Sequence, residues 1–144
     1  MKRHDDVTRD LFEMPVAPSP MVGNLDFRAE VAHRLAHMLA DSGFDRYEIA
    51  ARASRAAGKD VSKYMLDAYT AESREEFNLP LWLLPAIETA CSSHALTAWL
   101  AEMRGARLFV GSDALAAELG RIDRQRNALS DRARLIKQAL KETP

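Results

Sequence analysis

The sequence contains only one cysteine, Cys91, so no internal disulfide can form. A single thiol is typical of proteins in a reducing compartment, and we expect a cytoplasmic protein. The chain also lacks any apolar run near the ~20 residues that a helix needs to span a bilayer. Its start, MKRHDDVTRD, has basic side chains with no apolar segment behind them, so we expect neither a secretory signal nor a membrane partner.

Motifs of catalysis and cofactor binding are missing too. The sequence has no glycine-rich phosphate loop, no closely spaced cysteines and no nucleophile elbow. Cys91 and His94 could form a thiol–imidazole pair, but they straddle an expected helix boundary and have no third group to orient them. A buried structural cysteine is the simpler interpretation. We therefore expect a protein that is not an enzyme and that needs no cofactor.

A metal site is not expected either. His33, His37 and Asp41 follow one another at one-turn intervals on an expected helix. The run HRLAH lacks the glutamate of a metalloprotease helix. Because the apolar stripe of this helix lies on the opposite face, we expect the three side chains to point into solvent.

What the sequence does contain is a succession of helical patterns. A hydrophobic content of 47% in 144 residues is enough to form a core. Apolar residues recur at helical spacing in residues 26–41, with Asp26 as the expected N-cap, and again around Trp82 and Trp99, which we expect to anchor the core. Pro85 requires that the helix near Trp82 either begins near Leu84 or is kinked there. The fold class predicted from these patterns is all-α.

The stretch from Asp45 to Thr70 predicts two short helices joined by a turn. Asp45 can cap the first helix, and Glu48 lies three residues later, as in a reciprocal capping box. Gly58 is expected to end that helix because glycine tolerates a positive φ. Either Asp60 or Ser62 can start the second helix, and this succession is typical of a helix-turn-helix.

The segments YEIAARAS and VSKYMLDAY resemble the central helices of lambda-repressor-like helix-turn-helix regulators of temperate phages, including the phage CII-type regulators. The run NLPLWLLPAIETACSSHALTAWLAEMRG is similar to the two closing helices of such a domain, so the resemblance covers residues 27–105. It implies a five-helix DNA-binding domain and a regulator of phage or prophage origin. Two features depart from the family: the connection from Ala50 to Val61 is long, and the reading face carries Asp67 and no arginine.

This resemblance implies that the second helix of the pair enters the major groove of double-stranded DNA. Lys63 would contact a phosphate or a guanine edge, and Tyr64 a phosphate or a thymine methyl group. Ser62 would bind a phosphate near the helix N-terminus, and Asp67 could accept from a cytosine amino group. Further contacts to the DNA backbone are expected from three arginines, Arg46, Arg52 and Arg55.

Positive charge is concentrated elsewhere in the chain. The formal net charge is −1, and residues 45–76 hold six basic and seven acidic side chains. Residues 121–141 hold seven basic side chains and two acidic ones, a surplus of five positive charges. Affinity for phosphates is therefore expected to depend on the C-terminal segment as well as on the helix-turn-helix.

The C-terminal segment has the heptad pattern of a coiled coil. Eight positions alternate in steps of four and three without a helix breaker: Leu115, Leu119, Ile122, Arg126, Leu129, Ala133, Ile136 and Leu140. We expect a helix over residues 112–142 that assembles the chain into a homodimer or homotetramer. The alternative is a helix that folds back on its own domain.

Residues 1–24 are expected to form a flexible tail because prolines at 15, 18 and 20 prevent a helix. The run DLFEMP, residues 10–15, is similar to the peptide that bacterial sliding clamps bind, which suggests a host or phage protein as a partner. The alternative is that Leu11 and Phe12 pack on the domain. The short run ARLFV, residues 106–110, is either a strand or an extended connector.

The sequence therefore predicts four parts: a tail (1–24), a helix-turn-helix domain (25–105), a connector (106–111) and an oligomerisation helix (112–142). The leading functional hypothesis is a sequence-specific transcriptional regulator that binds DNA as an oligomer. The alternative is a protein-interaction adaptor that uses the same fold without binding DNA, which the acidic run from Glu72 to Glu76 favours.

Overall fold

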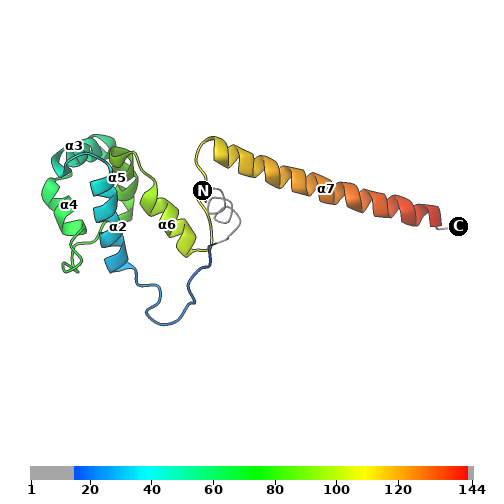
Figure 1. The fold of residues 1–144 in the computed structure, drawn as a ribbon, viewed down its shortest axis with the longest axis horizontal. Helices are drawn as coiled ribbons and strands as arrows, with labels where there is room; N and C mark the ends of the chain where they lie inside the picture. Colours follow the sequence, from blue (N-terminus) through cyan, green and yellow to red (C-terminus); the bar gives the residue numbers. More distant parts are fainter. Residues whose placement is uncertain (1–14, 143–144) are drawn as a thin grey trace, which may run out of the picture. The chain divides into compact units, whose positions relative to one another are not determined.

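The computed structural model describes residues 15–142, and within this range every regular element is a helix and no strand occurs. The all-α prediction is confirmed. Residues 1–14 lie outside the described range, and with them Leu11, Phe12 and most of the sliding-clamp-like run. The elements are α2 (Arg28–Asp41), α3 (Arg46–Ala57), α4 (Lys63–Tyr69), the short 3-10 helix η1 (Leu81–Leu83), α5 (Leu84–Cys91), α6 (Ala95–Met103) and α7 (Ser112–Glu142) (Figure 1).

The chain divides into two compact units, Met1–Leu108 and Phe109–Pro144. In the first unit, α2 to α6 surround a single core, and α3 packs mainly on α5 (Figure 1). The largest side chains that are fully buried are all aliphatic, and they come from six helical segments: Leu35, Leu39, Ile49, Leu66, Leu83, Ile87 and Leu96. Burying these side chains stabilises the unit by about 1.5–3 kcal/mol each relative to leaving them exposed.

The two tryptophans occupy different environments, so the expectation that both anchor the core is wrong for one of them. The side chain of Trp99 is 4% exposed and makes an edge-to-face contact with Phe27, with 5.5 Å between ring centroids. Trp82 is 55% exposed, and Lys59 Nζ lies 4.6 Å from its ring centroid. The reason is that Trp82 lies in η1, where Leu83 and not Trp82 points into the core.

The first helix begins two residues later than expected. Phe27 is the N-cap residue of α2, and Asp26 instead accepts a hydrogen bond from the backbone N–H of Arg28 at 3.2 Å. Phe27 is partly buried against the core, and α2 begins at the residue after it. The predicted end at Asp41 is confirmed.

Pro85 sets where α5 begins. Residues 81–83 form η1, and α5 then starts at Leu84 with Pro85 in its first turn, where the missing N–H costs no helical hydrogen bond. Of the two alternatives for this proline, the start near Leu84 is correct and the kink is wrong.

A buried glutamate joins α5 to α6. Glu88 is 5% exposed, and its carboxylate accepts from the backbone N–H of Thr97 at 2.8 Å and from the Thr97 hydroxyl at 2.6 Å. Glu88 therefore satisfies a backbone N–H in the first turn of α6 that has no partner within the helix. The N-cap side chain usually has this role. The hydroxyl of Ser93 accepts from the backbone N–H of Ala95 at 3.1 Å, while Ser92 ends α5 with a φ of 52°.

The second unit consists of the end of the connector and one continuous helix. Residues 106–110 contain no strand, so the extended-connector alternative is correct. Helix α7 is 31 residues long and buries none of its side chains. All eight heptad positions are exposed: Leu115, Leu119, Ile122, Arg126, Leu129, Ala133, Ile136 and Leu140. Between residues 15 and 142, no helix has both the length and the hydropathy to cross a membrane.

Candidate nucleic-acid interface

Helices α3 and α4 form as short, separately capped segments. Asp45 accepts from the backbone N–H of Glu48 at 2.9 Å and caps α3 as expected. The reciprocal half of the capping box is replaced, because the Glu48 carboxylate accepts from Arg52 Nε at 2.8 Å. Gly58 ends α3 with a φ of +64°, a conformation in which glycine carries no steric cost.

Ser54 fixes the long connection between the two helices. Its hydroxyl oxygen accepts from the backbone N–H of Val61 at 2.8 Å, and it lies within donating distance of the carbonyl oxygens of Ala50 (2.8 Å) and Val61 (3.0 Å). A mid-helix serine thus satisfies backbone groups of a segment seven residues away. Val61 is buried, so the enlarged turn folds back onto the core.

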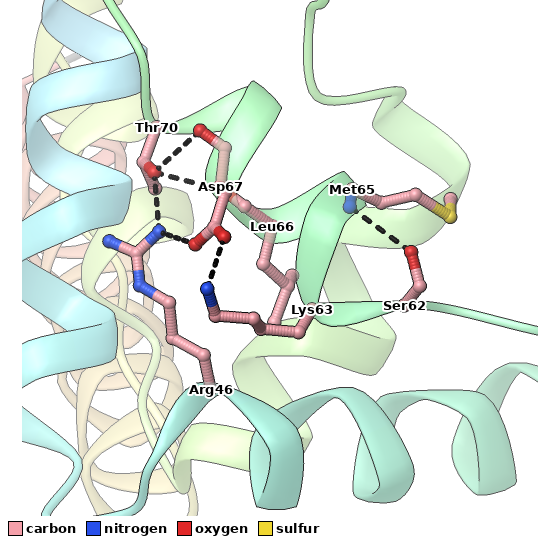
Figure 2. A network of polar contacts seen from close by, with 7 residues as sticks. All are labelled: Arg46, Ser62, Lys63, Met65, Leu66, Asp67 and Thr70. Atoms are coloured by element: carbon pink, nitrogen blue, oxygen red, sulfur yellow. Dashed lines mark hydrogen bonds and ion pairs between the residues drawn. The ribbon is translucent and has the colours of Figure 1, made fainter.

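The N-terminus of α4 is capped by Ser62, whose hydroxyl accepts from the backbone N–H of Met65 at 3.2 Å (Figure 2). This bond uses the hydroxyl oxygen as an acceptor and does not engage the O–H, which is the group that the expected phosphate contact would need. The inward side of α4 carries Leu66, which is fully buried, and this side chain holds the seven-residue helix on the core.

Two cations of the expected DNA-binding set meet at one acid. Arg46 Nη1 donates to Asp67 Oδ1 at 2.6 Å, and Lys63 Nζ lies 2.7 Å from Asp67 Oδ2. Arg46 also donates to the hydroxyl of Thr70 at 2.8 Å. Figure 2 shows the arginine of α3 and the lysine of α4 approaching the two oxygens of the same carboxylate. We call Arg46, Lys63 and Asp67 the α4 charge cluster.

Asp67 and Lys63 are both ionised at neutral pH. The hydrogen bond from Lys63, followed by that from Arg46, lowers the pKa of Asp67 against the opposing effect of burial. The same hydrogen bond with Asp67 raises the pKa of the Lys63 ammonium. The three side chains are each about one-third exposed, so solvent reaches all of them.

Exposed tyrosines flank this cluster. Tyr64 on α4 is 74% exposed and Tyr47 in the first turn of α3 is 66% exposed. Lys63 Nζ lies 5.7 Å from the ring centroid of Tyr64 and 5.8 Å from that of Tyr47. Tyr47 is not among the site residues predicted from the sequence. The sequence held one signal for this residue: Tyr47 follows Arg46 in the first turn of α3. The packing of α3 against α4 brings that turn beside α4.

The remaining two arginines have different surroundings. Arg52 pairs with Glu48, and its guanidinium carbon lies 3.7 Å from the ring centroid of Phe44. It therefore packs on Glu48 of its own helix and on Phe44, which precedes that helix. Arg55 is exposed on α3. The structure brings together Arg46, Lys63, Tyr64 and Asp67 from the expected set, and it adds Tyr47.

One cavity lies away from these residues. It has a volume of about 610 Å³ and is lined by one face of α2 and by residues 91–93 and 95. His33 and His37 line it in edge-to-face contact, 4.5 Å between ring centroids, and His33 Nδ1 lies 3.4 Å from Glu72. Among the described residues, no group of three or more potential ligands is arranged to hold a metal ion.

Cys91 borders this cavity but is 5% exposed, and burial raises the pKa of its thiol. A protonated, buried thiol is a poor nucleophile. We expect a thiol-specific reagent such as dithionitrobenzoate to react with the folded protein at least about 100-fold more slowly than with the protein in denaturant. Because the chain has one cysteine, the absorbance reports this site alone. Equal rates would show that the Cys91 region opens readily.

Comparisons with protein-family models, with curated proteins and with solved structures found no match to this chain. By its fold, the described part of the chain is an all-helical domain followed by one long helix that forms a unit of its own.

Proposed function

We propose that this protein is a non-enzymatic, sequence-specific DNA-binding regulator of the lambda-repressor-like helix-turn-helix type, encoded by a phage or prophage. The observation that carries the proposal is the grouping of Tyr47, Lys63 and Tyr64 at the first turns of α3 and α4. Side chains at the N-terminus of such a second helix are placed to reach base edges, while those at the start of the first helix reach the DNA backbone.

In this proposal, α4 enters the major groove and α7 assembles the chain into an oligomer. Tyr64 and Lys63 contact bases or phosphates from α4, and Tyr47 and Arg55 contact phosphates from α3. The positive surplus of residues 121–141 attracts DNA over a longer range. An oligomer doubles the number of phosphate contacts and imposes a symmetric operator.

The test is a salt titration with a mixed-sequence duplex of about 20 base pairs, long enough for two half-sites. The logarithm of the affinity should fall linearly with the logarithm of the salt concentration, with a slope of about −0.9 per phosphate contacted. Binding can be followed by fluorescence anisotropy from about 50 to 200 mM salt. Absence of salt-dependent binding over this range would contradict the proposal.

Tyr64→Ala is expected to weaken duplex binding about tenfold, equivalent to about 1.4 kcal/mol. The melting temperature should stay the same because substitutions of exposed side chains change stability by only about 0.5 kcal/mol. Leu81→Ala is a matched control, since Leu81 is 76% exposed, close to the exposure of Tyr64, and lies outside the α3–α4 pair. Equal DNA affinities of the two variants would mean that α4 does not face DNA.

A second candidate function is a protein-interaction adaptor. It is favoured by the α4 charge cluster, in which one acid engages two cations, and by three exposed acids in the loop before η1, Glu72, Glu75 and Glu76. An adaptor should show no salt-dependent binding to the duplex in the same titration, and Tyr64→Ala should instead reduce binding to a defined protein partner.

A further inference from the structure

The arrangement of the α4 charge cluster is unusual for a surface that must bind phosphates. Asp67 Oδ1 pairs with Arg46 at 2.6 Å, and Asp67 Oδ2 pairs with Lys63 at 2.7 Å, so each oxygen of the carboxylate contacts one cation. The carboxylate therefore occupies the position that a DNA phosphate would take. Like a phosphate, it is an anion whose oxygens bridge one cation from each helix. Thr70 fixes the arginine further by accepting from the same Nη1 at 2.8 Å.

This geometry has a consequence for binding to DNA of any sequence. A phosphate that approaches Arg46 or Lys63 must displace a carboxylate that is already in place, and it meets the negative charge of that carboxylate. The gain from releasing counterions is then smaller than for two free cations. A contact from Tyr64 to a base edge does not carry this penalty, because its ring is 74% exposed and can be reached without displacing the carboxylate.

We propose that Asp67 is a specificity-determining residue that restrains non-specific DNA binding by keeping Arg46 and Lys63 engaged within the protein. This inference rests on the proposed function, because it concerns the same interface. Asp67 acts through the two cations and is a positioning residue. Duplexes that offer only phosphates are bound weakly, and a duplex that offers the correct base edges gains enough contacts to release the two cations from Asp67.

The test compares the full-length protein with Asp67→Asn, which keeps the shape of the side chain and removes its charge. Glu102→Gln is the matched control: it also removes one negative charge, at an exposed position of α6 outside the α3–α4 pair. A mixed-sequence duplex of about 20 base pairs serves as the probe, titrated at several salt concentrations. Asp67→Glu, which keeps the charge, tests rescue.

Asp67→Asn is expected to bind the mixed-sequence duplex about tenfold more tightly at low salt, with a salt slope steeper by about one to two contacts. Glu102→Gln should match the wild-type slope, and Asp67→Glu should remain within about threefold of wild type. A change in overall fold alone would not steepen the salt slope, and circular dichroism confirms that each variant retains its helices.

The inference is overturned if Asp67→Asn binds no more tightly than Glu102→Gln, or if it binds more weakly, as expected when Asp67 reads a cytosine directly. Tighter, more salt-dependent binding by Asp67→Asn than by both wild type and Glu102→Gln supports it. Failure of the proposed function has a different signature: wild type and all three variants then show no salt-dependent duplex binding, and the inference falls with it.

Discussion

Deleting residues 112–144 is expected to give a monomer that binds duplex DNA at least about 100-fold more weakly than the full chain. Two linked DNA-binding domains gain this factor because binding of the second domain becomes intramolecular. The deletion also removes the positive surplus of residues 121–141. The remaining domain should keep its helices, since no side chain of α7 is buried. Size-exclusion chromatography with light scattering gives the mass, and anisotropy gives the affinity.

Two point variants separate oligomerisation from charge. Ile136 lies on the heptad stripe and is 53% exposed, whereas its neighbour Leu135 lies off the stripe and is 65% exposed. Ile136→Asp should shift the protein to monomer, because a charge in the seam of a coiled coil is left without a partner. Leu135→Asp makes the same change of charge and should keep the oligomer. Equal masses for the two variants would mean that the stripe is not the contact surface.

Trp99→Ala is expected to destabilise the helical domain by about 3–5 kcal/mol, the range for removing a large aromatic side chain from a core. The ring is 4% exposed, touches Phe27, and has the guanidinium of Arg34 4.9 Å from its centroid, so its removal leaves a cavity lined by two helices. For a domain of this size the melting temperature should fall by roughly 12 °C or more. Thermal unfolding followed by circular dichroism measures both quantities.

The control is already present in the chain. Trp82→Ala removes the same side chain from an exposed position, where the ring contacts Lys59. Its cost should stay below about 1 kcal/mol, the usual value of an exposed cation–π contact. Similar losses for the two variants would show that the ring of Trp82 is buried and that its exposed placement is wrong.

The sequence by itself determined the features that depend on local interactions. The caps Asp45 and Ser62, the glycine that ends α3 and the continuous helix over residues 112–142 are all set by neighbours within one or two turns. Helical spacing of apolar residues was enough to predict an all-α fold. These predictions succeed because the groups that satisfy each other lie close together in the chain.

Tertiary structure decided the features that depend on distant residues. Which tryptophan is buried follows from how η1 meets the core, and the role of Glu88 follows from the approach of Thr97, nine residues away. The clearest case is the candidate interface. Arg46 and Asp67 are 21 residues apart, so only the packing of α3 against α4 could show that the arginine, Lys63 and the carboxylate form one cluster.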